Sequence, residues 1–386
     1  MKRVSFLIAV ALVAIVLLVI LNHLPLTLMP RSQPAIKQAA LKDRIQLLEE
    51  RGGNTAPIEA IVDQMFEPAS SGHSDRTEAL LDQAIAMADA ALRALPPSSQ
   101  MQLPLDNAPE PKTDLYSDPQ SVTIAGYEGD AMEPFISPDG NYLFFNNSNA
   151  SGVDTNLYWA ERNGPLSFRS LGELPGVNSP FLDAVPSLDT AGHFYFTTLR
   201  EFDRTRASVY VGDFDSRGVH NVHPVPGHIN PIALRTVNMD TGISPDGQTL
   251  YISRAVIVPG APAPASSILT IARLHNGGFE LDPKADAILK NVNTGALAYA
   301  PCISANGLDL FFTRASRRVN TAGELEPTVR VLVATRPTTD VSFGTPMVLS
   351  SLTGFVEAPS VSLDEKELFF HKRVGNRYII ERAVRR

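Results

Sequence analysis

Residues 133–140 read Glu-Pro-Phe-Ile-Ser-Pro-Asp-Gly, and the apolar triplet Leu143-Phe144-Phe145 follows after two more residues. Proline presets the φ angle of a turn, aspartate bonds to nearby backbone and glycine adopts positive φ, so Ser-Pro-Asp-Gly predicts a tight turn. Three apolar residues in succession indicate a strand that is buried on both faces. The phrase therefore predicts a β-hairpin within a layered β structure.

The same phrase recurs four more times along the chain. Its copies are marked by Pro134, Pro186, Thr241, Pro301 and Pro359, at steps of 52, 55, 60 and 58 residues. A third strand follows every hairpin, and a more polar fourth strand follows the first four. Four-stranded antiparallel units whose two faces are covered by their neighbours are the blades of a β-propeller. We therefore predict a mainly β fold, with a five-bladed β-propeller over residues 121–386; a β-solenoid is the alternative, but its repeats are shorter.

The two ends of this region predict ring closure. The fifth copy has only three strands before the chain ends at Arg386, whereas the strand-like piece Ser121–Ala125 precedes the first copy. This piece is predicted to complete the last blade, which would remove the open edges of the sheets.

The repeated phrase resembles a known repeat. The run Ile136-Ser137-Pro138-Asp139-Gly140 and its copies are similar to the WD40-like β-propeller repeat (PD40) of TolB-type periplasmic proteins. The Ser-Pro-Asp-Gly turn is intact in the first and third copies only, and the N-terminal part is not the globular domain of TolB. The resemblance implies an extracytoplasmic propeller that binds a partner, and it carries over no catalytic residue.

The N-terminus predicts a membrane anchor. After Lys2 and Arg3, the 18 residues from Val4 to Leu21 contain one polar residue, Ser5. A helix of that length spans about 27 Å, close to the bilayer core. A signal-peptide core is shorter, and no small-x-small cleavage site follows. We expect residues 1–30 to form an uncleaved transmembrane signal anchor that leaves the bulk of the chain outside the cell membrane, in the periplasm or at the cell surface; a cleaved signal peptide is the alternative.

The segment between anchor and propeller divides into two parts. Residues 31–95 are rich in Ala, Leu, Glu and Gln, and Gly52-Gly53 and Pro96-Pro97 end amphipathic stretches, so we expect short helices that form a stalk. They serve either as a partner-binding or dimerisation module, or as a spacer that packs on itself or on the propeller. Residues 96–120 contain six prolines and are typical of a linker.

Composition excludes several classes of function. A net charge of -8 and a pI near 5.5 disfavour nucleic-acid binding. The single cysteine, Cys302, excludes an intramolecular disulfide framework and a multi-cysteine metal site. No phosphate loop, nucleophile elbow, HExxH motif or dinucleotide fingerprint is present.

Two kinds of charged residue recur with the repeat. A carboxylate precedes the first strand of the hairpin in four copies: Glu133, Asp183, Asp240 and Glu357. In the fourth copy this place belongs to Tyr299 or Ala300. An arginine follows the second strand in four copies: Arg200, Arg254, Arg314 and Arg373. If first strands line the central channel, these side chains ring its mouth and could bind a divalent cation or a cationic partner segment. The competing interpretation is architectural, because repeats reuse capping carboxylates and ion pairs between blades, whereas a catalytic set should break the period.

We therefore expect a non-catalytic binding or scaffold module for a protein or a cell-envelope polysaccharide, with no cofactor. The alternative is a glycoside hydrolase that uses Glu133, Asp183 and Asp240, since some five-bladed propellers carry paired carboxylates at the channel mouth. That alternative requires carboxylates converging on one pocket, about 5–9.5 Å apart, one of them with a raised pKa. It is disfavoured because these carboxylates follow the repeat, and because the only tryptophan, Trp159, lies in a predicted blade strand.

Overall fold

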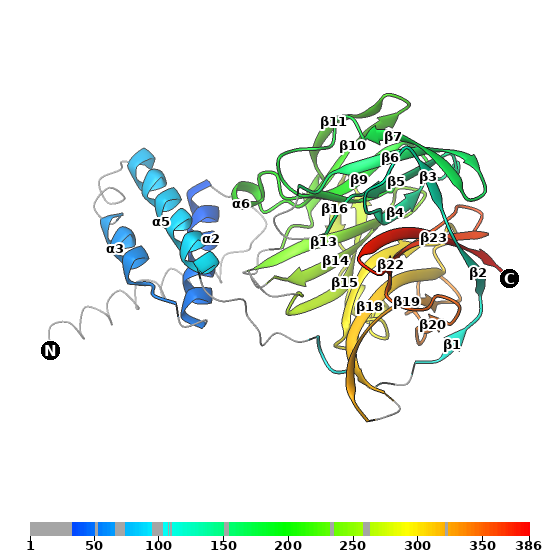
Figure 1. The fold of residues 1–386 in the computed structure, drawn as a ribbon. Coiled ribbons are helices and arrows are strands. Elements are labelled where there is room, and N and C mark those ends of the chain that lie inside the picture. Colours follow the sequence, from blue (N-terminus) through cyan, green and yellow to red (C-terminus); the bar gives the residue numbers. More distant parts are fainter. Residues whose placement is uncertain are drawn as a thin grey trace.

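A computed structural model describes residues 33–50, 53–65, 74–94, 103–106, 108, 110–149, 154–231, 235–257, 263–320 and 323–386. Its strands form five sheets arranged around one axis, which confirms the predicted five-bladed β-propeller (Figure 1). The innermost strands of the five sheets contact one another in a closed ring. The axis of the propeller is therefore lined by the first strand of each blade.

Each blade is built from consecutive antiparallel strands. The first blade contains β4 (Met132–Ile136), β5 (Tyr142–Asn146), β6 (Leu157–Gly164) and β7 (Ser167–Glu173). The second contains β8 (Asp183–Leu188), β9 (His193–Thr198), β10 (Val209–Asp215) and β11 (Gly218–Pro224). The third contains β13 (Thr236–Ile243), β14 (Thr249–Val256), β15 (Ser266–His275) and β16 (Gly278–Leu281). The fourth contains β17 (Leu297–Ile303), β18 (Asp309–Val319), β19 (Leu325–Thr335) and β20 (Met347–Leu349). The fifth contains β21 (Val356–Val361), β22 (Glu367–Val374) and β23 (Arg377–Arg385).

The core lies between blades. Leu143, Phe144 and Phe145 of β5 are fully buried, as three successive apolar residues on a strand between two packed sheets must be. Phe144 packs into the cluster shared with the second blade, and Phe145 into the cluster shared with the fifth. Trp159 is buried in the same inter-blade core and stacks on Tyr142, with ring centroids 5.5 Å apart.

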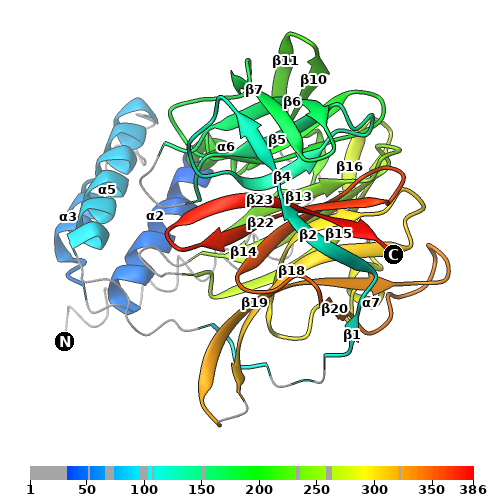
Figure 2. The same ribbon diagram turned by 45° about the vertical axis from the view of Figure 1, so that its right-hand side comes forward.

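Short strands at the start of the propeller join three blades. β1 (Lys112–Thr113) pairs in parallel with β20, β2 (Tyr116–Ser121) pairs antiparallel with β23, and β3 (Thr123–Ala125) pairs in parallel with β7. The segment 112–125 thus binds the fourth, fifth and first blades in turn (Figure 2). A similar two-residue strand, β12 (Gly227–His228), pairs with β16 of the third blade.

The closing strand differs from the predicted one. The last blade is completed by Tyr116–Ser121, whereas Ser121–Ala125 was expected to do so. The chain leaves the fifth blade after the bond from the Val122 N–H to the Ile380 carbonyl, 2.9 Å, and residues 123–125 continue onto the outer edge of the first blade. Ring closure is therefore present, but its strand begins about five residues earlier than expected.

Part of the proline-rich segment is fixed to the fourth blade by buried charges. Glu110 lies 2.8 Å from Arg330 and 3.5 Å from both Arg314 and Arg318, and Asp106 lies 3.9 Å from Arg318. Both carboxylates are largely buried against β18 and β19. These contacts place Asp106 and Glu110 on the propeller ahead of the strands that close it.

Among the described residues before the propeller, three helices pack into a small bundle. They are α2 (Gln33–Glu50), α3 (Ala56–Gln64) and α5 (Ser74–Ala94). Leu48, Ile61 and Leu81 belong to their shared apolar core. The ion pair between Arg44 and Asp89, 2.7 Å, joins α2 to α5. Helix α2 contacts the short helix α6 (Phe202–Thr205), which lies in the loop between β9 and β10, so the bundle sits beside one end of the propeller (Figures 1 and 2).

The described helices, α7 (Ala285–Ile288) included, contain no segment long and apolar enough to span a bilayer. The predicted anchor, residues 1–30, lies outside the described residues.

Candidate functional site

A pocket of about 950 Å³ lies at the mouth of the propeller that faces the helical bundle. The bundle contributes Arg44 and Leu47 of α2 and Asp89 and Leu92 of α5. The second blade and its α6 loop contribute a mainly apolar wall: Leu182, Ala184, Val185, Leu199 and Phe202. The pocket therefore lies between the two parts of the chain, and most of the side chains around it are apolar.

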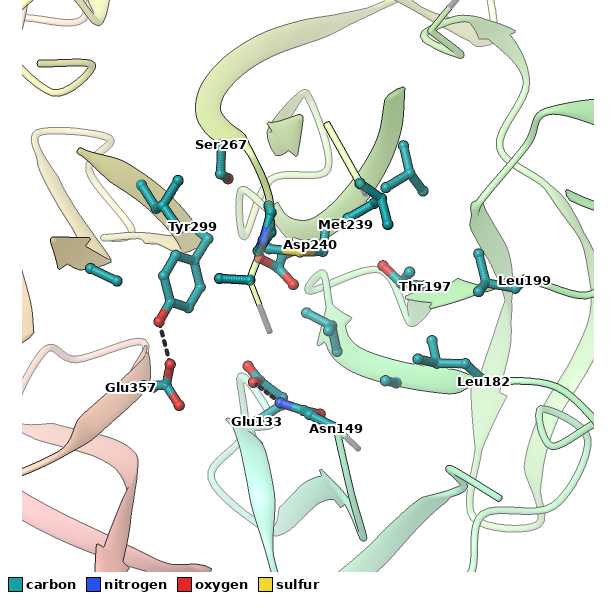
Figure 3. Close-up of a pocket in the computed structure, with 18 of the residues that line it drawn as sticks. Glu133, Asn149, Leu182, Thr197, Leu199, Met239, Asp240, Ser267, Tyr299 and Glu357 are labelled. Atoms are coloured by element: carbon teal, nitrogen blue, oxygen red, sulfur yellow. Dashed lines mark hydrogen bonds between the residues drawn. The ribbon is translucent and has the colours of Figure 1, made fainter. Parts of the chain in front are cut away.

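The inner strands place a polar floor in this pocket. We call the floor the four side chains Glu133, Asp240, Tyr299 and Glu357, which come from the first, third, fourth and fifth blades. Figure 3 shows the three carboxylates pointing toward the same space. Three of the four carboxylates singled out from the sequence are thus brought together, and Tyr299 takes the place of a carboxylate in the fourth copy.

The fourth carboxylate, Asp183, lies elsewhere. It does not line the pocket; its Oδ2 accepts the N–H and the hydroxyl of Ser179 at 2.6 and 2.7 Å, and its Oδ1 lies 2.8 Å from Arg200. The Asp183 side chain is completely buried in this arrangement. Its contacts are those of a residue that organises the turn into the second blade.

The recurring arginines also lie outside the pocket. Arg200, Arg254 and Arg314 each donate to a backbone carbonyl at the turn between blades, namely that of Val177, Ile229 and Val292 respectively. Arg373 differs and donates to the Gly375 carbonyl at 3.2 Å. The contacts of the first three follow the repeat, as the architectural interpretation requires.

A histidine that the sequence analysis did not single out organises one side of the floor. The backbone N–H of Glu133 donates to Nδ1 of His371 at 3.1 Å, so the ring proton lies on Nε2 and is donated to Glu357 at 2.9 Å. The hydroxyl of Tyr299 donates to the other oxygen of Glu357. With a donor on each oxygen, the side chain of Glu357 is held in place at the floor.

The other two carboxylates lie in a less polar environment. Asn149, also missed from the sequence, donates to Oε1 of Glu133 at 2.7 Å, and the Ala300 N–H donates to Oδ2 of Asp240 at 3.0 Å. Burial raises the pKa of Glu133, the nearby His371 lowers it and the charge of Glu357 raises it again, with a net increase. Burial and the charge of Glu133 raise the pKa of Asp240 to about 8. At neutral pH the floor therefore contains a protonated Asp240.

The histidine belongs to a repeated polar position. The residue after each apolar triplet of the second strand is polar and almost fully buried: Asn146, Thr197, Ser253, Thr313 and His371. Three of them bond the N–H of a residue with left-handed backbone on the inner strand of the next blade: Asn146 bonds Val185, Thr313 bonds Ala358 and His371 bonds Glu133. This recurring polar residue is visible in the sequence, and it could have identified His371 as a residue that bonds the next blade.

This repeated hydrogen bond is broken beside the third blade. Asp240, on the inner strand there, does not have the left-handed φ seen at the equivalent positions, and Oγ1 of the preceding Thr197 has no hydrogen-bond partner among the described residues. Between the third and fourth blades, the Ala300 N–H donates to Asp240 and not to Ser253, the polar residue at the repeated position. The Ser253 hydroxyl instead forms a hydrogen bond with that of Ser267. Asp240 and Thr197 thus depart from the period, and both line the pocket (Figure 3).

The described residues contain no group of three or more His, Cys, Asp or Glu side chains that could hold a metal ion. Cys302 of β17 is buried in the core between the fourth and fifth blades; burial raises the pKa of its thiol to about 11, and its sulfur accepts the N–H of Val361 at 3.4 Å. These contacts are those of an unreactive structural thiol.

No protein-family model matches the chain, and no curated protein matches it. Solved structures that resemble it include an α-L-arabinofuranosidase from Podospora anserina, with 11% identity, 72% of this chain and 98% of that chain covered and a TM-score of 0.39. TolB from Acinetobacter baumannii has 14% identity, with 66% and 54% covered and a TM-score of 0.35. A family 117 glycoside hydrolase from the marine bacterium Zobellia galactanivorans has 12% identity, with 70% and 91% covered and a TM-score of 0.45. At these identities and TM-scores we draw nothing about function from the matches.

Proposed function

We propose that this protein is a non-catalytic binding module whose ligand enters the pocket between the helical bundle and the propeller. The observation that carries the proposal is the pocket itself: about 950 Å³, walled mainly by apolar side chains, with a few convergent polar groups at its floor. Pockets of this size and composition are the usual sites for small organic ligands. The buried part of the ligand is therefore largely apolar.

The pattern of polar groups supports binding over catalysis. Each oxygen of Glu357 already accepts a hydrogen bond, from Tyr299 and from His371, and Arg200, Arg254 and Arg314 donate to backbone carbonyls between blades. A polysaccharide, one of the partners expected from the sequence, presents many hydroxyl groups, and the wall formed by Leu182, Ala184 and Leu199 offers them no hydrogen bonds. An apolar ligand or an apolar part of a partner fits this wall better.

Filling the pocket tests the proposal. The neutral probe 4-phenylbutanol is titrated calorimetrically into the full chain in nanodiscs, with empty nanodiscs subtracted. Leu199 lines the pocket and is 38% exposed, so Leu199→Trp should fill part of the space and weaken binding at least about tenfold. Leu281, 37% exposed on β16 and outside the pocket lining, provides the matched control Leu281→Trp, which should bind as the wild type does. Absence of binding to the wild type, or equal binding by Leu199→Trp, would overturn the proposal.

We further propose that the module is held at the cell membrane by residues 1–30, with the propeller outside the cytoplasm. The support is the 18-residue apolar run after Lys2 and Arg3. Fractionation and N-terminal sequencing of the mature protein test this proposal. A soluble product that lacks residues 1–30 would identify the run as a cleaved signal peptide.

A glycoside hydrolase is the second candidate. The observation that favours it is the convergence of Glu133, Asp240 and Glu357 on one pocket, with raised pKa values at the first two. Asp183, which the sequence suggested for the catalytic set, lies outside that pocket. A panel of chromogenic glycosides with Glu133→Gln and Asp240→Asn separates the candidates: turnover by the wild type that is lost in both variants would replace the binding proposal.

A further inference from the structure

The pocket has two chemically different ends. Toward the second blade and the bundle its lining is mainly apolar and includes Leu47, Leu92, Leu182 and Leu199. Toward the third, fourth and fifth blades its floor carries carboxylates and the hydroxyl of Tyr299 (Figure 3). A ligand that fills the pocket therefore meets apolar surface along its body and acidic groups at its inner end.

We propose that the floor of this pocket, between Glu133 and Asp240, is a subsite for the cationic amine head of an otherwise apolar ligand. The inference rests on the proposed function, because it assigns the chemistry of the ligand that the pocket binds. It depends on geometry that is independent of the apolar wall, so it can fail while the binding proposal stands.

The hydrogen bonds at the floor leave acceptors for such a head group. Asn149 donates to one oxygen of Glu133, and the second oxygen of this carboxylate has no hydrogen bond to a described residue. The Ala300 N–H donates to one oxygen of Asp240. Both oxygens of Glu357 already accept a hydrogen bond, from Tyr299 and from His371, whereas one oxygen of Glu133 has none to a described residue. A primary ammonium group has three donors and no acceptor, which matches this set of acceptors.

A second observation points to a ligand at the same place. Thr197 lines the pocket and is only 3% exposed. Its Oγ1 has no hydrogen-bond partner among the described residues. Figure 3 shows it on the side of the pocket next to Asp240. Buried hydroxyls without a partner are uncommon in native structures. Its hydroxyl is an acceptor for a donor bound beside Asp240, and it occurs where the repeated bond between blades is broken.

The other charged groups around the pocket are consistent with a cation at the floor. Arg44 pairs with Asp89 at 2.7 Å, and Arg206, Arg235 and Arg317 also line the pocket. All of these arginines have interactions with other parts of the chain. None of them belongs to the floor, so the inner end of the pocket is acidic and the cations lie nearer the walls.

The protonation of Asp240 couples amine binding to pH. The carboxyl group interacts with Glu133, Glu357, Tyr299, the Ser253 hydroxyl and the Ala300 N–H, and burial, followed by the charge of Glu133, raises its pKa to about 8. Below pH 8 an arriving ammonium group must displace the carboxyl proton, because the protonated acid does not offer a full negative charge. Amine affinity should therefore rise as the pH increases from 6 to 8, while the affinity for a neutral alcohol should stay the same.

The experiment compares three probes with one apolar body: 4-phenylbutylamine, 4-phenylbutanol and 4-phenylbutyrate. They are titrated into the full chain in nanodiscs at pH 6 and pH 8, with empty nanodiscs subtracted. At pH 8 the amine should bind about tenfold tighter than the alcohol, since a hydrogen bond to a charged group is stronger than a neutral one, and the carboxylate should bind most weakly. Between pH 6 and 8 the amine affinity should increase at least about fivefold.

Variants locate the preference. Asp240→Asn and Glu133→Gln should bring the amine to about the affinity of the alcohol, and Thr197→Val should weaken the amine several-fold. Glu173→Gln changes an exposed carboxylate on β7 outside the pocket and should keep the tenfold preference. Thr197→Val keeps the shape of the side chain, so it tests the site even if a carboxylate variant fails to fold.

The outcomes separate the two proposals. Equal binding of amine and alcohol to the wild type, or an amine preference that survives both Asp240→Asn and Thr197→Val, would overturn the cation subsite and leave the pocket as a ligand site. Absence of binding by all three probes would overturn the pocket proposal as well.

Discussion

The backbone N–H of Glu133 donates to Nδ1 of His371 at 3.1 Å, and this bond joins the first blade to the fifth at the point where the ring closes. His371 is fully buried, and its Nε2 lies 2.9 Å from Glu357. The imidazole therefore satisfies a backbone donor of one blade and a carboxylate of another. The side chain that joins the first blade to the fifth thus also holds Glu357 in position at the floor of the pocket.

Replacing His371 should destabilise the propeller in proportion to the partners that are lost. His371→Leu leaves the Glu133 N–H and the Glu357 carboxylate without the ring, and we expect a loss of about 2–4 kcal/mol in the free energy of unfolding. His371→Asn should lose less, because an asparagine occupies the same repeat position in the first blade: Asn146 there accepts the N–H of Val185 from the second blade. Urea denaturation of the two variants measures both values. Equal losses would show that the buried volume, and not the hydrogen bonds, determines the effect.

Two threonines at the same place in the repeat should respond in opposite directions to the same change. Oγ1 of Thr313 accepts the N–H of Ala358 at 2.9 Å, so Thr313→Val should cost about 1–3 kcal/mol of stability. Oγ1 of Thr197 has no partner among the described residues, so Thr197→Val removes a buried polar atom without breaking a bond and should be neutral or stabilising by up to about 1 kcal/mol. Thermal and urea denaturation of the pair provide the comparison. Destabilisation of both by the same amount would contradict the assignment of a missing bond at Thr197.

The buried charges that hold the segment before β1 predict a third effect. Glu110 faces Arg314, Arg318 and Arg330, and its loss would leave these arginines buried together without the carboxylate between them. Glu110→Gln should therefore cost about 2–4 kcal/mol, measured by urea denaturation. Glu326→Gln, at an exposed position of β19, is the matched control and should change stability by less than about 0.5 kcal/mol. A small effect of Glu110→Gln would mean that water or a shift of the segment compensates for the charge.

Local chemistry made the blades predictable from the sequence. The turn that begins at Ser137 forms as its residues require: Gly140 has φ +74°, Asp139 accepts the Asn141 N–H at 3.0 Å, and Ser137 accepts the Tyr142 N–H at 2.9 Å. These contacts lie within six residues of sequence. The position of the closing strand was less predictable, because the choice between Tyr116–Ser121 and Ser121–Ala125 depends on pairing with β23, at the far end of the chain.

The composition of the floor could be predicted only in part. Glu133 and Asp240 directly precede the marker residue of their copy, Glu357 and Tyr299 lie two residues before it, and Asp183 lies three before it. In a regular strand a shift of one residue reverses the side-chain direction. A β-bulge interrupts every inner strand, with left-handed backbone at Glu133 and at the equivalent residues of three other blades, so alternation does not tell which carboxylate faces the pocket. The part of the lining that Leu47 and Leu92 contribute depends on how α2 and α5 pack over the mouth, and the repeat contains no information about that packing.

The protonated carboxyl of Asp240 predicts how stability depends on pH. Burial, followed by the charge of Glu133, raises the pKa of Asp240 in the folded chain to about 8, whereas an unfolded aspartate titrates near about 3.9. Between these values the folded state binds the proton and the unfolded state does not, so the free energy of unfolding falls as the pH rises. One proton contributes a slope of up to about 1.4 kcal/mol per pH unit. The pKa of Glu133 is raised in the same direction and adds to this slope.

Asp240→Asn should therefore flatten the pH dependence between pH 5 and pH 8. An asparagine at position 240 still presents an oxygen to the Ala300 N–H, so the variant keeps the inter-blade bond while losing the titration. Relative to the wild type it should gain at least about 1 kcal/mol of stability on going from pH 5 to pH 7, as measured by urea denaturation at each pH. Asp139→Asn is the control: hydrogen bonds from Ser137 and Asn141 outweigh desolvation and hold the pKa of Asp139 below its ordinary value, so its titration lies below this range. Parallel pH profiles for the wild type and Asp240→Asn would mean that Asp240 is already ionised at pH 5. The proposal that a bound amine displaces the proton of Asp240 would then be wrong.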